Sequence, residues 1–229
     1  MEINEIEKIS VESSFFETII KICSAPSVIF SAFIDFIFSL HSKGQFNNVA
    51  DVVNQHTSDL NIIKETLGGK NFYLNTPVYV EDLLSTLQKA KDEANGKKRE
   101  LYAAYLTACC HPENINCSSK TIYLNKLSQL DEVGLLILQY LGNYSIPNRI
   151  MTALFVDKGV TINTEDLYNH LYDLESMKVI EKINIKDFLA THKRGGNRMP
   201  RNSENRIIYK RTSLGNGLYN FIISGIPNE

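Results

Sequence analysis

The densest group of side chains that could bind a charged ligand lies between His192 and Arg211. Glu204 is the one acidic residue in this range, and Gly195, Gly196 and Pro200 favour an exposed loop. The cationic and amide side chains that could reach phosphates are Lys193, Arg194, Asn197, Arg198, Arg201, Arg206, Lys210 and Arg211. This segment predicts contact with the backbone or minor groove of a nucleic acid. The alternatives are a solvated charged hairpin and docking on an acidic protein face.

The overall charge requires such a contact to be local. The 229 residues contain 24 Lys plus Arg and 26 Asp plus Glu, a formal net charge of −2. This balance excludes a uniformly basic coat for nucleic acid. With 43% hydrophobic and 22% charged residues, the chain is neither disordered nor membrane-like in bulk, and it is long enough for one large or two small domains.

Catalytic and metal-binding patterns are weak in this sequence. Cys109, Cys110 and His111 with Cys117 form the one metal-like cluster, but adjacent cysteines on a helix point about 100° apart. Structural zinc favours thiolates separated by two residues. We therefore expect no metal, no cofactor and no enzymatic activity.

The histidines do not indicate a catalytic group either, because they lie on separate predicted elements with no shared spacing. They are His41, His56, His111, His170 and His192. An acid–base role needs a partner within hydrogen-bond reach. We expect each histidine to be a surface or capping residue.

Four thiols in a long chain and an acidic N-terminus without a secretory signal predict a cytoplasmic protein. The apolar segment 27–41 is the one membrane candidate. A sixteen-residue helix spans about 24 Å, short of the roughly 30 Å of a hydrocarbon core. Its small polar residues recur every four positions, which favours a packed helix and a homodimer seam over a membrane segment.

The N-terminal part has helical spacing of its apolar residues. We expect helices over 2–23, 27–41, 46–67, 81–95 and 99–110. Residues 71–80, aromatic and β-branched but interrupted by Pro77, are expected to form an extended connection. The Asn- and Ser-rich segment 114–121 is the expected linker, so residues 1–113 form an all-helical domain.

The pattern changes after the linker. Helices are expected over 128–141, capped by Ser128, over 147–157, and over 164–177, capped by Thr164. Period-two segments at 179–185 and 206–211 predict two strands, and a closing helix follows. The expected fold is mainly α, an all-helical domain followed by a winged helix-turn-helix domain over 122–229 with a β-hairpin wing.

Two stretches of this region resemble the bacterial winged-helix regulators of the MarR and PadR types. The first runs from Thr164 through Leu167, Leu171 and Leu174 to Met177-Lys178-Val179-Ile180, and the second is Tyr209-Lys210-Arg211-Thr212-Ser213-Leu214-Gly215. Those families usually have glycine before the first strand, where this chain has Lys178, so we expect the turn to form without a left-handed residue. The resemblance implies DNA binding, transcription regulation and a homodimer.

A second resemblance covers residues 97–141. Arg99-Glu100-Leu101-Tyr102-Ala103-Ala104-Tyr105-Leu106, His111-Pro112 and Tyr123-Leu124-Asn125-Lys126-Leu127-Ser128 look like the Abi-alpha family. That resemblance implies a bacterial antiphage role by abortive infection and transfers no catalytic residue.

The expected recognition helix 164–178 does not favour conventional reading of the major groove. It carries four carboxylates, of Glu165, Asp166, Asp173 and Glu175, which phosphates would repel, although Tyr168 and Asn169 could touch bases or sugars. Two hypotheses follow. The first is a non-catalytic bacterial regulatory or defence protein that contacts DNA through its basic wing. The alternative is an abortive-infection effector whose winged helix, with its acidic helix, binds a protein partner, either in solution or at a membrane.

Overall fold

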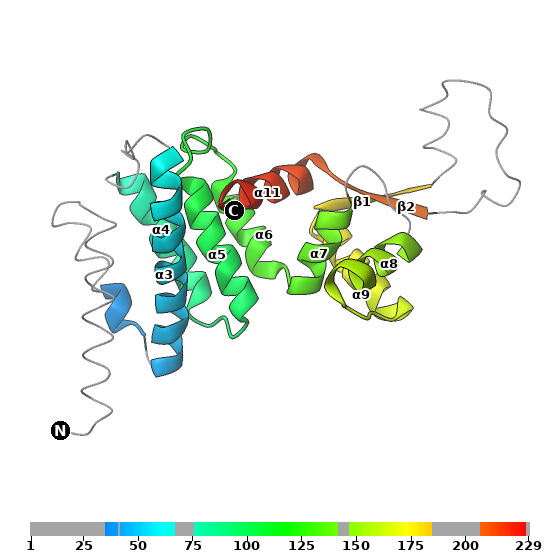
Figure 1. Cartoon of the computed structure of the whole chain (residues 1–229), viewed down its shortest axis with the longest axis horizontal. Helices are drawn as coiled ribbons and strands as arrows, with labels where there is room; N and C mark the ends of the chain where they lie inside the picture. The colour runs from blue at the N-terminus through cyan, green and yellow to red at the C-terminus, as the bar shows by residue number, and fades with distance from the viewer. Residues whose placement is uncertain (1–34, 41, 67–75, 142–146, 185–206, 228–229) are drawn as a thin grey trace, which may run out of the picture. The chain divides into compact units, whose positions relative to one another are not determined.

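The computed structural model describes residues 35–40, 42–66, 76–141, 147–184 and 207–227. They form a mainly helical protein with one two-stranded antiparallel hairpin, as the sequence predicted (Figure 1). The elements are α3 (Lys43–Thr66), α4 (Pro77–Ala90), α5 (Gly96–Cys109), α6 (Lys120–Gln129), α7 (Glu132–Tyr140), α8 (Pro147–Lys158), α9 (Thr164–Ser176), β1 (Ile180–Asn184), β2 (Ile207–Arg211) and α11 (Ser213–Ser224). Two compact units divide the chain, residues 1–128 with 220–229 and residues 129–219.

The core of the first unit lies between α3, α4 and α5, where α4 is antiparallel to both neighbours (Figure 1). Val49, Val52 and Val53 of α3 are fully buried, as are Leu83 and Leu87 of α4. These apolar residues recur at spacings of three and four, which places them on one face of each helix. The helices expected over 46–67 and 99–110 are therefore confirmed, whereas the helix expected over 81–95 ends at Ala90.

Helix α4 begins earlier than predicted. The expectation of an extended connection is wrong for residues 77–80, which form its first turn. The Thr76 hydroxyl accepts a hydrogen bond from the Tyr79 backbone N–H at 3.3 Å, and Pro77 occupies a position where its missing donor costs little. This cap and the burial of Tyr79 outweigh the strand propensity of the segment.

The first unit extends further along the chain than expected. Helix α6 begins at Lys120, inside the predicted linker 114–121, and Lys120 is only 5% exposed. The Lys120 ammonium lies 3.0 Å from a carboxylate oxygen of Asp82, and the Lys120 carbonyl accepts a hydrogen bond from the Tyr105 hydroxyl at 3.1 Å. These buried polar contacts hold the segment in the first core, and the boundary between the compact units follows Ser128.

Residues 220–229 also belong to the first unit, in contrast to the expected domain 122–229. The ring of Phe221 packs against the rings of Tyr105 and Tyr123, with centroid distances of 5.4 and 5.3 Å. Such aromatic pairs contribute stability beyond the area that they bury. The end of the chain therefore completes the first core.

The first helix of the second unit, α7, has a different cap from the predicted one. Ser128 does not cap α7; it lies in α6, and its hydroxyl donates to the Asn125 carbonyl at 2.8 Å. The cap is Asp131, whose carboxylate accepts from the Gly134 backbone N–H at 2.6 Å. Asp131 is a favourable cap for α7 because its carboxylate also interacts favourably with the helix dipole.

Helix α11 requires glycine at two places where backbones approach closely. A side-chain carbon at Gly215 would collide with the carbonyl oxygen of Val179 in the second unit, and one at Gly225, just after the helix, would collide with that of Ala104 in the first. Glycine avoids both collisions because it has no Cβ.

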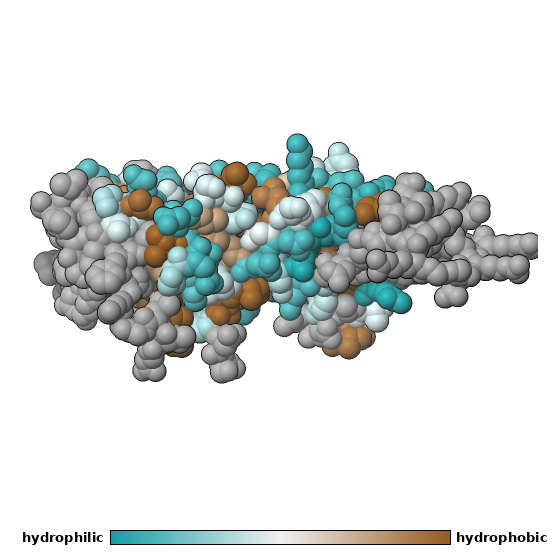
Figure 2. All heavy atoms as spheres, turned by 90° about the horizontal axis from the view of Figure 1, so that it is seen from above, coloured by the Kyte–Doolittle hydropathy of each residue, from teal (hydrophilic) through white to brown (hydrophobic). Residues whose placement is uncertain are grey.

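Only part of the predicted N-terminal helices lies within the described residues. The helix expected over 2–23 lies outside the described residues, as does most of 27–41. In the described part, Phe36 is buried whereas Phe38 is 81% exposed. Among the described helices, none is long and apolar enough to cross a membrane. Figure 2 shows apolar side chains as separate spots between hydrophilic ones on the face in view.

Candidate nucleic-acid interface

Helix α9 is built as an amphipathic helix whose buried stripe matches the prediction. Its buried residues are Leu167, Leu171 and Leu174, followed by Met177 just beyond the helix. The predicted cap is wrong by one residue, because the Asn163 side chain, rather than that of Thr164, accepts from the Asp166 backbone N–H at 2.8 Å. Asparagine forms this cap at least as well as threonine does.

The outer face of α9 is aromatic and acidic. Tyr168 is 45% exposed and Tyr172 is 71% exposed, and Asn169 is exposed beside them. The exposed carboxylates of this helix are those of Glu165, Asp166 and Asp173. A helix with this charge would be repelled by phosphates in a groove.

The junction between α9 and β1 forms with an unexpected conformation. Lys178 itself has φ 60°, so the expectation that the turn avoids a left-handed residue is wrong. The Val179 N–H donates to the Leu174 carbonyl at 3.2 Å, and the Thr212 hydroxyl donates to the Lys178 carbonyl at 2.7 Å. These two hydrogen bonds hold Lys178 in a conformation that normally favours glycine.

The hairpin pairs Ile180 with Arg211 and Asn184 with Ile207 in antiparallel register. Tyr209 of β2 is buried. Burial raises the pKa of the Tyr209 hydroxyl, and the nearby Glu175 carboxylate raises it further. Glu175 and Tyr168 of α9 therefore both lie near the Tyr209 hydroxyl.

The cations of the described hairpin differ in their partners. The Lys210 ammonium lies 2.6 Å from a Glu181 carboxylate oxygen. The Arg211 guanidinium carbon lies 4.3 Å from the centre of the Tyr219 ring, and its buried Nε and Nη1 atoms have no hydrogen-bond partner within the part of the chain that the structure describes. Lys182 is exposed. Of these hairpin cations, Lys210 is paired with a carboxylate, whereas Arg211 is stacked on an aromatic ring.

Four of the ten predicted nucleic-acid residues can be placed. Tyr168 and Asn169 lie on α9, and Lys210 and Arg211 lie at the end of β2. The predicted residues that lie outside the described residues are Lys193, Arg194, Asn197, Arg198, Arg201 and Arg206. The structure therefore describes the two paired strands and not the segment between them.

Sequence reasoning missed a buried polar cluster in the first unit. His56 is fully buried, not a surface or capping residue, and its ring nitrogens lie 2.9 Å from the Thr107 hydroxyl and 2.8 Å from the Tyr79 hydroxyl. Burial lowers its pKa to about 3, so the imidazole is neutral at pH 7. The position of His56 three and four residues after Val53 and Val52 is the signal that places it on the buried face.

The cysteines at and after the end of α5 are free thiols. Cys109 and Cys110 are buried free thiols, Cys117 is half-buried and free, and burial raises the pKa of Cys109. Within the described ranges, no group of three or more histidine, cysteine, aspartate or glutamate side chains is placed to hold a metal ion.

No family model, no curated protein and no solved structure matches this chain. Its function is therefore inferred from the charges, exposure and contacts of its own residues.

Proposed function

We propose that this chain is a non-catalytic regulatory or defence protein whose second unit is a winged helix-turn-helix that contacts nucleic-acid phosphates through its hairpin. The order α7, α8, α9, β1 and β2 supports this fold, since three helices followed by an antiparallel hairpin is the arrangement of a winged helix. The direct passage from α9 into β1 through Lys178 supports it further.

One observation carries the proposal: opposite charges lie on different elements of the second unit. The exposed carboxylates of α9 stand on a helix, whereas Lys178, Lys182 and Arg211 stand at or on the hairpin without a carboxylate partner among the residues that the structure describes. The sequence adds cations over 192–206, between the two strands. Phosphates would be attracted to the hairpin and repelled by α9.

The experiment replaces Arg194, Arg198 and Arg201 together with glutamine. Fluorescence anisotropy then measures the affinity of the full chain for a labelled DNA duplex at several salt concentrations. Each lost phosphate contact reduces the slope of log K against log salt by about 0.9, so we expect weaker binding and a slope smaller by up to about 3.

A matched control replaces three lysines of the first unit, Lys89, Lys91 and Lys97, with glutamine. It removes the same formal charge and should leave the slope unchanged. Absence of DNA binding by the wild-type chain, or an equal slope for both triple variants, would contradict the proposal.

A second candidate function is supported by the exposed face of α9. Tyr168 and Tyr172 are large, accessible aromatic side chains beside carboxylates, a combination that suits a cationic protein partner. A labelled peptide rich in lysine and arginine should then bind the wild-type chain and lose affinity with Tyr168→Ala and Tyr172→Ala. Binding of the peptide without binding of DNA would favour this function over the first.

We also propose that the chain forms a homodimer through segment 27–41. Phe38, whose ring is 81% exposed, is the described residue of this segment that a dimer would remove from water. Light scattering should give the mass of a dimer, and Phe38→Ser should shift it toward the monomer. A strict monomer at micromolar concentration would contradict the proposal.

A further inference from the structure

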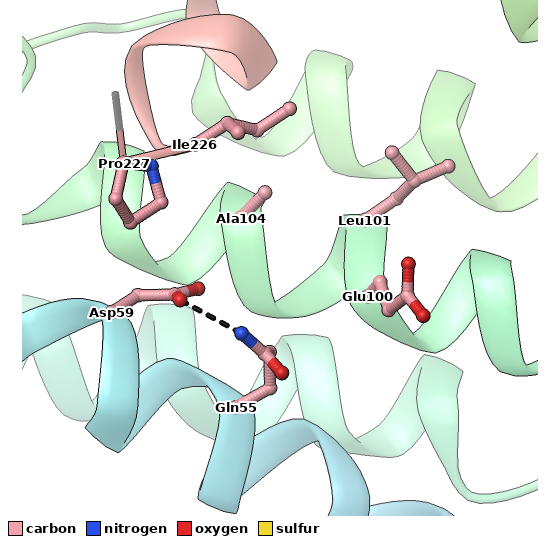
Figure 3. A pocket seen from close by; sticks show the side chains of 7 residues that line it. All are labelled: Gln55, Asp59, Glu100, Leu101, Ala104, Ile226 and Pro227. Atoms are coloured by element: carbon pink, nitrogen blue, oxygen red, sulfur yellow. Dashed lines mark hydrogen bonds between the residues drawn. The ribbon is translucent and has the colours of Figure 1, made fainter. Parts of the chain in front are cut away.

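A cavity of about 290 Å³ opens between helices of the first unit (Figure 3). Gln55 and Asp59 of α3 line one side, and Leu101 and Ala104 of α5 form the floor. Ile226 and Pro227 close the side opposite Asp59, and Glu100 lies at the far end of the cavity. Its volume is near the lower limit of small-molecule sites, which begin at about 300 Å³.

The apolar wall depends on the close approach after α11. Gly225 lies so near the Ala104 carbonyl that a side-chain carbon would collide with it. This contact places the following residues, Ile226 and Pro227, over α5. The wall is therefore fixed by backbone packing of the first unit.

Asp59 is the polar centre of the cavity. It is only 5% exposed, and one of its carboxylate oxygens accepts a hydrogen bond from the Gln55 amide at 2.8 Å. Its other oxygen has no hydrogen-bond partner among the described residues. A buried carboxylate without a cation is unfavourable, and burial accordingly raises the pKa of Asp59.

The charges around the cavity indicate the class of ligand. Two carboxylates, of Asp59 and Glu100, line it, and no lysine or arginine does among the residues that form its described wall. The Glu100 carboxylate is exposed and already lies 3.2 Å from the Lys97 ammonium. Among the described residues, none supplies a positive charge to Asp59. The floor of the cavity offers apolar surface to a hydrocarbon.

We propose that this cavity binds a small primary alkylammonium ion. The ammonium group donates to the free oxygen of Asp59, and the alkyl chain lies against Leu101, Ala104 and Ile226. An ammonium has a pKa near 10.4 and is charged at pH 7, so it supplies the missing positive charge. A hydrogen bond between two charged groups is about twice as strong as a neutral one, which makes Asp59 the main determinant of affinity.

The test uses hexylammonium chloride with the full chain at pH 7.5, followed by isothermal titration calorimetry. Hexan-1-ol, of the same length but neutral, is the matched ligand control. Asp59→Asn keeps the shape of the side chain and removes its charge, and it should fold because it removes a buried carboxylate. Glu81→Gln removes an exposed carboxylate of α4 that does not line the cavity.

We expect saturable binding of hexylammonium to the wild-type chain and to Glu81→Gln, and affinity weaker by roughly tenfold or more for hexan-1-ol and for Asp59→Asn. Three outcomes would overturn the proposal. They are no saturable binding by the wild-type chain, equal affinity for the neutral alcohol, and full affinity in Asp59→Asn. Melting curves of the variants show whether each one is folded.

Discussion

Lys210 of β2 lies directly opposite Glu181 of β1, and its ammonium nitrogen is 2.6 Å from a Glu181 carboxylate oxygen. Ion pairs that water reaches contribute only about 0–1 kcal/mol to stability. The main effect of this ion pair is on the charge of the hairpin. Glu181 neutralises Lys210, one of the cations that the sequence predicts to contact phosphates.

Replacement of Glu181 with glutamine should strengthen DNA binding. It removes a negative charge that lies 2.6 Å from the Lys210 ammonium. The hairpin then repels phosphates less, so the affinity at low salt should rise. Anisotropy titrations at several salt concentrations measure this effect. Glu113→Gln, an exposed carboxylate of the first unit, makes the same change in net charge and should have little effect. Equal gains for both variants would assign the effect to overall charge.

Replacement of Lys178 with glycine should stabilise the second unit. Lys178 has φ 60°, and a left-handed conformation costs a residue with a Cβ about 1–2 kcal/mol that glycine avoids. Urea unfolding should show a higher midpoint for the variant. Lys182→Gly, in the adjacent strand, should lower the midpoint because strand glycine is unfavourable. A lower midpoint for Lys178→Gly would contradict the assigned conformation.

Acid should destabilise the first unit through His56. The pKa of His56 is about 3 in the folded chain and about 6.5 when unfolded, so the unfolded chain binds the extra proton between these values. The contribution of neutral His56 to the free energy of unfolding is therefore fully present above pH 6.5. It is lost as the pH decreases toward 3, by up to about 5 kcal/mol.

The measurement is urea unfolding of the wild-type chain and His56→Gln from pH 7.5 to 4.5. The variant should be less stable at pH 7.5, because it disturbs the hydrogen bonds to Thr107 and Tyr79, but its stability should depend less on pH. His170→Gln serves as control, since His170 is only half-buried and lies 3.3 Å from the Asp131 carboxylate. An unchanged pH dependence in His56→Gln would contradict the neutral buried state.

Local periodicity was sufficient to predict most helices and the hairpin. The spacing of Leu167, Leu171 and Leu174 identified the buried face of α9, and the alternation after Val179 identified β1. Caps were less predictable, because neighbouring residues compete for the same backbone donors. Asn163 caps α9 in place of Thr164, and Asp131 caps α7 in place of Ser128.

Contacts between distant residues could not be predicted from spacing. The first core includes Lys120 through Asp82, 38 positions away, and its chain end through the rings around Phe221. The cavity around Asp59 likewise depends on the approach of Gly225 to Ala104. Such contacts depend on how the helices pack, and the local spacing of apolar residues does not predict them.

Chemical-shift mapping of the full ¹⁵N-labelled chain with a DNA duplex tests the central claim most directly. We expect backbone amide shifts at Lys178, Lys182 and Arg211, at or on the hairpin, and loss of these shifts at high salt. We expect little change from Tyr168 to Asp173 on the outer face of α9. Shifts that concentrate on α9, or none at all, would contradict phosphate contact through the hairpin.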